Sequence, residues 1–182
     1  MAVATGSHKL GPESASLQVK TYREGVAAKV GHDLVIDVTR WEATVDIGAD
    51  PASSRVELSA DSRSMEVREG VRGVKPLTDK DRDEIRKTIE AKVLGTQPIA
   101  FRSTLVADDA VDGELTIAGA TRPVAFRLQR DGDRVRATVR VVQSQWGIKP
   151  YRGLMGALKV RDDVEIVIDA RLSARFAKTG PA

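Results

Sequence analysis

The side chains best suited to acid–base chemistry are two histidines, His8 and His32. His32 stands between Val30 and Leu34 in a run with apolar residues at every second position, so it shares the apolar face of a predicted strand. Two interpretations stay open: a half-buried histidine bonded to a backbone carbonyl, or a group that contacts a ligand inside the fold. Asp33 must point to the opposite face, which disfavours a His32–Asp33 catalytic pair or metal chelate.

Other catalytic chemistries lack the residues they need. The sequence has no cysteine, which excludes thiolate catalysis, disulfides and cysteine–metal sites. It also has no Gly-x-Ser-x-Gly nucleophile motif and no phosphate-binding Gly-x-x-x-x-Gly-Lys-Ser/Thr loop. His8 lies in an N-terminal stretch without apolar periodicity, so we expect no metal site. We therefore expect a protein that is not an enzyme and has no cofactor; the alternative is an enzyme acting on a small hydrophobic molecule, with His32 as acid or base.

Composition narrows the class of protein further. The 29 basic and 26 acidic residues are interspersed, and aromatic residues make up only 4% of the chain, so we expect no nucleic-acid partner. Hydrophobic residues form 41% of the chain but in short runs, which excludes a membrane-spanning helix. The N-terminus shows no basic segment followed by an apolar stretch, which predicts a cytoplasmic location.

Two predicted loops concentrate basic residues. They carry Arg68, Arg72 and Lys75, and Lys149 and Arg152, respectively. These side chains are candidates for holding an anionic head group at the mouth of a cavity, or they are ordinary solvated loop residues. In the second loop region, Trp146 and Tyr151 either gate such a mouth or fill one end of the core.

The elements that must position these groups are mostly strands. Apolar residues alternate with polar ones along nine runs, which predicts about eight or nine strands with one apolar face each. The runs cover residues 17–19, 26–38, 41–47, 56–60, 99–105, 115–117, 124–128, 135–141 and 164–172. Short turns between them favour antiparallel neighbours, arranged as a sandwich or as a barrel.

One segment breaks the period of two. Residues 78–94 place an isoleucine or valine at every fourth position, with acids early and lysines late. This pattern predicts an amphipathic helix that is capped by Thr78 or Asp79 and stopped at Gly95. The chain is then expected to comprise a flexible arm over 1–15, one domain over 16–175 and a short tail over 176–182.

The order of these features resembles the YceI-like family. The resemblance covers residues 17–172 and rests mainly on QPIAFRSTLV, ELTIAGATRPVAFRL and WGIKPYRGLMGALKVRDDVEIVID. It implies an all-β fold, a lipocalin-like antiparallel barrel of eight strands with one helix packed against it. It further implies an apolar tunnel that binds a polyisoprenoid, an isoprenoid quinone or a fatty-acid-like amphiphile. Family members are often exported and dimeric, so a homodimer is expected.

Together, the alternation and the resemblance predict which residues line the tunnel. They are Val30, His32, Leu34, Ile36, Trp41, Val45, Phe101, Ile117, Phe126, Val139, Trp146, Ile166 and Ile168. The leading hypothesis is a protein that carries or sequesters a lipid. Besides the enzyme, a scaffold with a filled core that works through protein contacts remains a third possibility.

Overall fold

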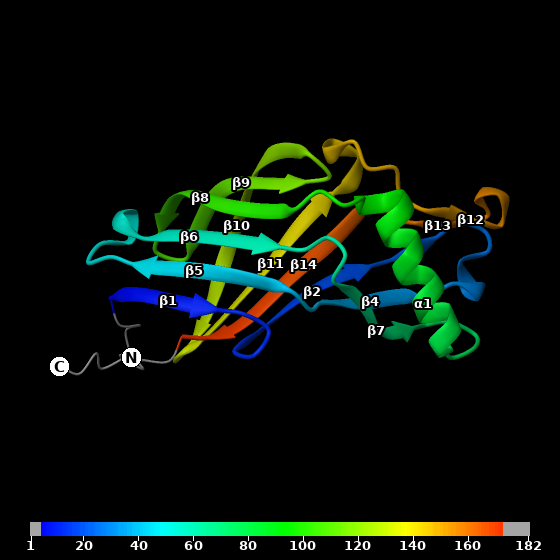
Figure 1. Ribbon diagram of the computed structural model, residues 1–182, viewed down its shortest axis with the longest axis horizontal. Helices are drawn as coiled ribbons and strands as arrows, with labels where there is room; N and C mark the ends of the chain where they lie inside the picture. Colours follow the sequence, from blue (N-terminus) through cyan, green and yellow to red (C-terminus); the bar gives the residue numbers. More distant parts are fainter. Residues whose placement is uncertain (1–4, 173–182) are drawn as a thin grey trace.

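The main feature of the fold is one long antiparallel sheet that curls around an apolar interior (Figure 1). The structure is a computed structural model that describes residues 5–172. The sheet has 11 strands in the order β1-β5-β6-β8-β9-β10-β11-β14-β2-β4-β7. Its strands are β1 (Gly6–Leu10), β2 (Ala15–Thr21), β4 (Asp33–Val38), β5 (Trp41–Ile47), β6 (Arg55–Ala60), β7 (Met65–Val71), β8 (Ile99–Ala107), β9 (Ala110–Ile117), β10 (Ala120–Asp131), β11 (Arg134–Val142) and β14 (Asp163–Arg171).

The antiparallel, barrel-like architecture with one helix is confirmed, but the count of eight strands is wrong. The alternation missed β7, because its polar positions hold acids and an arginine that suggest a loop. It also missed β1, which pairs along its whole length with β5 from Gly6↔Ile47 to Leu10↔Ala43. The expected flexible arm over 1–15 is therefore wrong for residues 6–10, and the tail over 176–182 lies outside the described residues.

A second, small sheet lies at one end of the molecule, beside the helix (Figure 1). Its order is β12-β13-β3, formed by β12 (Arg152–Gly153), β13 (Leu158–Val160) and β3 (Arg23–Glu24). Short 3₁₀ turns lie at η1 (Ala28–Val30), η2 (Pro51–Ser53), η4 (Gln143–Trp146) and η5 (Leu154–Gly156).

The first half of the predicted strand over 26–38 is not a strand. Gly25 has a φ of 99°, a left-handed conformation that suits glycine, and the chain then turns through η1 before β4 begins at Asp33. Val26 and Val30 therefore project into solvent. Alternation cannot distinguish this pattern from a strand, because apolar residues recur at every second position in both.

The predicted helix is confirmed as α1 (Asp79–Thr88), which continues through the π-helical segment η3 (Ile89–Leu94). Thr78 caps it: its hydroxyl accepts from the Asp81 N–H at 3.2 Å, and the Asp81 carboxylate accepts from the Thr78 N–H at 2.9 Å. Arg82 donates to the backbone carbonyls of Val67 and Arg68 on β7, both at 2.7 Å. These bonds fix the helix along the edge of the sheet.

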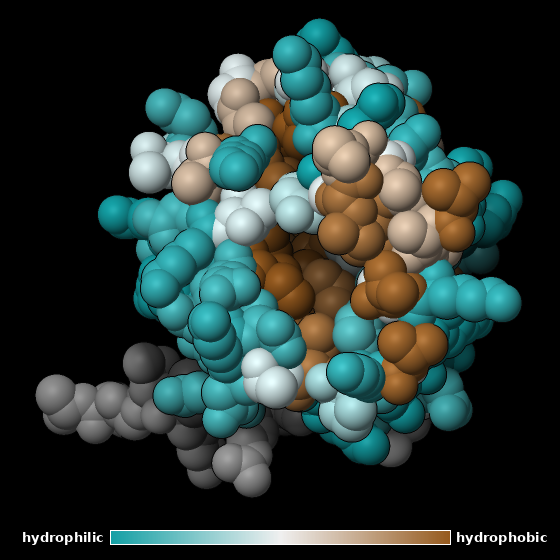
Figure 2. All heavy atoms as spheres, turned by 90° about the vertical axis from the view of Figure 1, so that its right-hand side faces the viewer, coloured by the Kyte–Doolittle hydropathy of each residue, from teal (hydrophilic) through white to brown (hydrophobic). Residues whose placement is uncertain are grey.

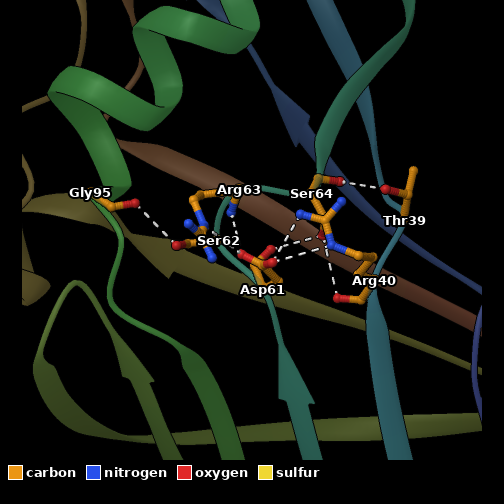
Figure 3. Close-up of polar contacts among 7 residues, drawn as sticks. All are labelled: Thr39, Arg40, Asp61, Ser62, Arg63, Ser64 and Gly95. Atoms are coloured by element: carbon orange, nitrogen blue, oxygen red, sulfur yellow. Dashed lines mark hydrogen bonds and ion pairs between the residues drawn. The ribbon is translucent and has the colours of Figure 1, made fainter.

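Two neighbouring connections carry the chain between the halves of the sheet, and Asp61 joins them (Figure 3). Residues 39–40 link β4 to β5, and residues 61–64 link β6 to β7. The Asp61 carboxylate accepts from the Arg63 N–H at 2.8 Å and from the Arg40 guanidinium at 2.9 and 3.2 Å. The two connections are thus tied by charge-assisted hydrogen bonds.

Serine hydroxyls extend this cluster to the helix (Figure 3). The buried Ser64 hydroxyl donates to the carbonyls of Asp61 and Arg40, at 2.8 and 3.3 Å. The buried Ser62 hydroxyl donates to the carbonyl of Gly95, which directly follows η3, at 3.0 Å. The end of the helix is therefore held to the same corner of the sheet.

The Asp61 contacts predict a specific loss of stability in acid. The Arg63 N–H, followed by the Arg40 side chain, lowers the pKa of Asp61 to about 2. A depressed pKa stabilises the fold while the carboxylate is ionised, so this contribution is complete above about pH 4 and disappears as the pH falls to about 2. Across this window, the urea midpoint of the wild type should fall further than that of Asp61→Asn.

The matched control is Asp112→Asn, whose side chain is exposed on β9. It should keep the acid dependence of the wild type. If the wild type and Asp61→Asn lost stability in parallel, the contacts of Asp61 with Arg40 and Arg63 would contribute nothing to the stability of the fold.

No helix among residues 5–172 is long and apolar enough to span a bilayer.

Candidate ligand-binding cavity

The inward faces of the curled sheet enclose an elongated chamber of about 620 Å³. Ile166, Ile168 and Ala170 of β14, and Leu172 directly after it, lie in its wall, as the pleat of a strand requires. The apolar wall residues are Leu10, Leu17, Ala43, Val45, Ile47, Val56, Leu58, Phe101, Val106, Val111, Phe126, Leu128, Val135, Ala137, Val139, Ile166, Ile168, Ala170 and Leu172. A volume of this size is typical of ligand pockets.

A smaller cavity of about 90 Å³ continues the chamber into the sheet. It reaches toward the end that carries α1, where its wall includes Val19, Val38, Met65 and Ile99. Its wall is entirely apolar, and six residues belong to both cavities, so the two cavities adjoin; we call them together the apolar path. The shared residues are Leu17, Leu58, Phe101, Phe126, Val139 and Ile166.

Two aromatic rings lie at the junction of these cavities. The ring centroids of Phe101 and Phe126 are 5.6 Å apart, with the planes tilted by 54°. Gly113 on β9 makes room for Phe101, because a Cβ at this position would lie 2.4 Å from the Phe101 ring. The absence of a side chain at Gly113 therefore allows the Phe101 ring to lie against β9.

Six of the predicted site residues lie in the chamber wall: Val45, Phe101, Phe126, Val139, Ile166 and Ile168. Leu34, Ile36 and Trp41 instead pack in or against the first core cluster, and Ile117 and Trp146 lie in the second. The prediction for Val30 is wrong, since its side chain is exposed. Whether the six wall residues contact a ligand stays a prediction.

Both tryptophans fill the core. Trp146 is 4% exposed, and its indole N–H donates to the Leu115 carbonyl at 2.9 Å, so it packs as part of the core. Trp41 is also buried, and its indole N–H has no hydrogen-bond partner among residues 5–172. An unmade bond costs about 1–3 kcal/mol, so apolar packing accounts for the position of Trp41.

His32 contributes to neither cavity wall. Its Nε2 atom lies 2.6 Å from the Lys75 carbonyl oxygen, and Gly73 packs directly against the imidazole. This arrangement agrees with the interpretation of a half-buried histidine bonded to a backbone carbonyl. A contact between His32 and a ligand stays a prediction. No group of three or more metal-ligating side chains is found in the described range.

The five head-group candidates lie outside the chamber wall. Arg72 pairs with the buried Asp33 at 3.3 Å, and Arg68 lies 3.7 Å from Asp37. Lys75, Lys149 and Arg152 are exposed, and all five belong to segments at the end with α1 and the small sheet (Figure 1). The space-filling view of this end shows a hollow with apolar walls (Figure 2).

The opposite end of the chamber is bordered by Asp108, Asp109 and Arg130. Arg130 donates to the Asp108 carbonyl at 3.0 Å, and Arg127 pairs with the Asp109 carboxylate at 2.9 Å. Sequence reasoning missed this rim, because Asp108 and Asp109 lie in the turn between β8 and β9, which shows no period, and Arg130 is a charged residue near the end of β10. It also passed over Val111 and Ala137 as site residues, although their alternation with polar neighbours was a usable signal.

Charged groups are kept on the outer face of the wall. Arg134, and to a smaller extent Arg136, hold the pKa of Asp169 well below its usual range. A hydrogen bond to Glu165 at 2.5 Å raises the pKa of Tyr22 to about 12. These side chains pair with one another on the outer face. A ligand in the interior would therefore be buried among apolar side chains, with almost no polar group to bind.

Comparison with known proteins agrees with this geometry. The model of the YceI-like domain matches residues 10–172. The crystal structure of Burkholderia cenocepacia BcnA is similar in fold, with a TM-score of 0.57 and 16% sequence identity over 85% of this chain and 94% of that one. No match is found among curated proteins. Because the family model covers most of the chain, including every wall residue of the chamber, this protein belongs to the YceI-like family.

Proposed function

We propose that this protein binds one long apolar chain inside its curled sheet and thereby carries or sequesters a lipid. The observation that carries the proposal is the apolar path made up of the two adjoining cavities. The YceI-like family binds hydrophobic ligands. Within that class, we favour a polyisoprenoid, an isoprenoid quinone or a fatty-acid-like amphiphile.

The shape of the path supports an extended ligand. Ile166, Ile168, Ala170 and Leu172 all line it, and six residue steps along a strand cover roughly 20 Å. A flexible chain can follow this path past the two phenylalanine rings. Burial of such a chain stabilises the complex by about 0.8 kcal/mol per methylene before the costs of association.

The head group is expected to remain outside the apolar wall. A charged or strongly hydrated group would lose its water inside without gaining hydrogen bonds. Arg130 at one end and the exposed Lys75 and Arg152 at the other offer compensating charge. The assignment of Arg68, Arg72, Lys75, Lys149 and Arg152 to the head group stays a prediction.

Two measurements test the proposal. Native mass spectrometry and organic extraction of the purified protein should identify a co-purified lipid. Linear alcohols of increasing length, titrated against a dansyl-labelled fatty acid, should bind more tightly with each added methylene until the path is full. Affinity should then level off, because further carbons remain in water.

Affinity that does not depend on chain length would overturn the proposal. The expected homodimer and the expected cytoplasmic location also stay predictions. Sedimentation equilibrium and cell fractionation measure them, respectively.

A further inference from the structure

Exposed apolar side chains gather at one end of the molecule. Among residues 5–172, eight large apolar side chains are exposed, and Leu105 on β8 is the only one outside this end. The other seven are Val26, Val30, Val71, Val74, Tyr151, Leu154 and Met155. Figure 2 shows apolar side chains beside the hollow on this end of the molecule. Single exposed apolar residues are ordinary, but a gathering of this kind marks an interaction site.

Three loops meet to form this surface. The first, residues 25–31, is joined to the third, around η5, by a bond from the Ala27 N–H to the Ala157 carbonyl at 2.9 Å. The second loop, residues 72–76, is held beside the first by the bond between the Lys75 carbonyl and His32, which directly follows the first loop. We call Val26, Val30, Val74, Leu154 and Met155 the apolar tip.

Two adjacent residues of the tip have left-handed backbone. Leu154 has a φ of 50° and Met155 a φ of 54°, and their relative exposures are 60% and 107%. Neither side chain favours this conformation, which glycine and asparagine tolerate far better. Since the exposed side chains contribute little packing that would offset the strain, folding alone does not explain leucine and methionine here.

The surroundings of the tip are basic. The segments 23–32, 72–76 and 149–157 contain six basic residues, Arg23, Lys29, Arg72, Lys75, Lys149 and Arg152, and one acidic residue, Glu24. Arg72 pairs with Asp33. Lys29, Lys75, Lys149 and Arg152 form no ion pair within the described part of the chain. Their charge is available to an anionic partner.

We infer that the apolar tip docks this protein on an anionic phospholipid bilayer. Leu154, Met155 and Val26 insert among the lipid chains, while the lysines and Arg152 contact the head groups. The hollow visible at the same end then faces the membrane, so a ligand passes between the bilayer and the cavity without crossing water (Figure 2). This last step rests on the proposed lipid-binding function, whereas docking does not.

The positive charge around the tip favours an anionic bilayer over a second copy of the chain as the docking partner. In a symmetric dimer the same patch occurs on both subunits. Lys29, Lys75, Lys149 and Arg152 would then face their own copies, and like charges oppose association. An anionic bilayer complements both the apolar and the basic residues of the tip.

Vesicle flotation tests the inference with the full chain. The wild type should float with vesicles of phosphatidylcholine and phosphatidylglycerol in equal parts, and much less with phosphatidylcholine alone. The double variant Leu154→Asn/Met155→Asn should bind at least about tenfold more weakly, because it removes two inserted side chains. Its fold should be unharmed, since asparagine tolerates the left-handed backbone.

A second variant and a control complete the test. Lys29→Gln/Lys75→Gln should weaken binding about fivefold or more at low salt, and added salt should shrink the difference. Leu105→Asn removes an exposed apolar side chain far from the tip and should float like the wild type.

The outcomes separate docking from ligand binding. Loss of flotation in the asparagine variant, with titration of the dansyl-labelled fatty acid unchanged, supports docking. Equal flotation of the wild type and the asparagine variant overturns it, even when fatty-acid binding is normal. A wild type that docks but fails to bind any lipid chain contradicts the proposed function instead. Dimers that dissociate in the asparagine variant, without flotation of the wild type, identify the tip as a subunit interface and also overturn docking.

Discussion

Replacing Ile166 by glutamate is expected to abolish retention of a long apolar ligand. Ile166 lies on the wall of both cavities, so a carboxylate here would stand where the two cavities adjoin. The ligand would bury this charge without a partner, a cost of several kcal/mol that lowers affinity by about 100-fold or more. Titration of the dansyl-labelled fatty acid, with lipid extraction from the purified variant, measures the loss.

The matched control is Val167→Glu, the same change one position along β14. Successive residues of a strand point to opposite faces, so this carboxylate faces outward and should leave affinity near that of the wild type. Ala137→Phe fills the chamber without adding charge and should also lower affinity, whereas Thr138→Phe on the outer face should not. If a folded Ile166→Glu variant retained lipid at the wild-type level, the ligand would bind elsewhere.

Trp146→Ala is expected to cause a large loss of stability. The residue is 4% exposed and packs in the second core cluster with Leu115, Ile117, Val141 and Ile148. Truncating a buried tryptophan costs about 3–5 kcal/mol, through lost apolar burial and the cavity that remains. The free energy of unfolding, from urea titration followed by circular dichroism, measures the loss.

Two further variants separate the contributions of Trp146. Trp146→Phe keeps most of the apolar volume but removes the bond to the Leu115 carbonyl, at a cost of about 1 kcal/mol or somewhat more. Tyr151→Ala removes an exposed aromatic side chain and should change stability by less than about 0.5 kcal/mol. Unchanged stability of Trp146→Ala together with lost ligand binding would restore Trp146 as a gate.

Alternation predicted the long strands well because each buries one face. In β14, Val164, Ile166, Ile168 and Ala170 follow the pleat from one end to the other. The short edge strands gave a weaker signal: β1 has only 5 residues and starts at a glycine. At Val26 and Val30, a glycine turn and a 3₁₀ turn produced the same spacing as a strand.

The site was harder to predict than the fold, for a physical reason. Period two shows that a side chain points inward but does not show whether it meets empty space or another side chain. Ile36 and Ile117 are buried members of the two core clusters, whereas Val139 and Ile168, with the same signal, pack against these clusters and also line the chamber. The difference depends on contacts between strands that are not neighbours in the sheet, such as the Phe101 and Phe126 rings of β8 and β10, whose centroids lie 5.6 Å apart.

The two bonds from Arg82 to β7 have a consequence for the behaviour of the protein at high concentration. β7 ends the long sheet, so its outer carbonyls would otherwise attract a strand from another molecule. The guanidinium occupies the carbonyls of Val67 and Arg68, and α1 covers the same edge. The helix therefore protects the β7 edge against edge-to-edge aggregation while the interior of the sheet stays open to a ligand.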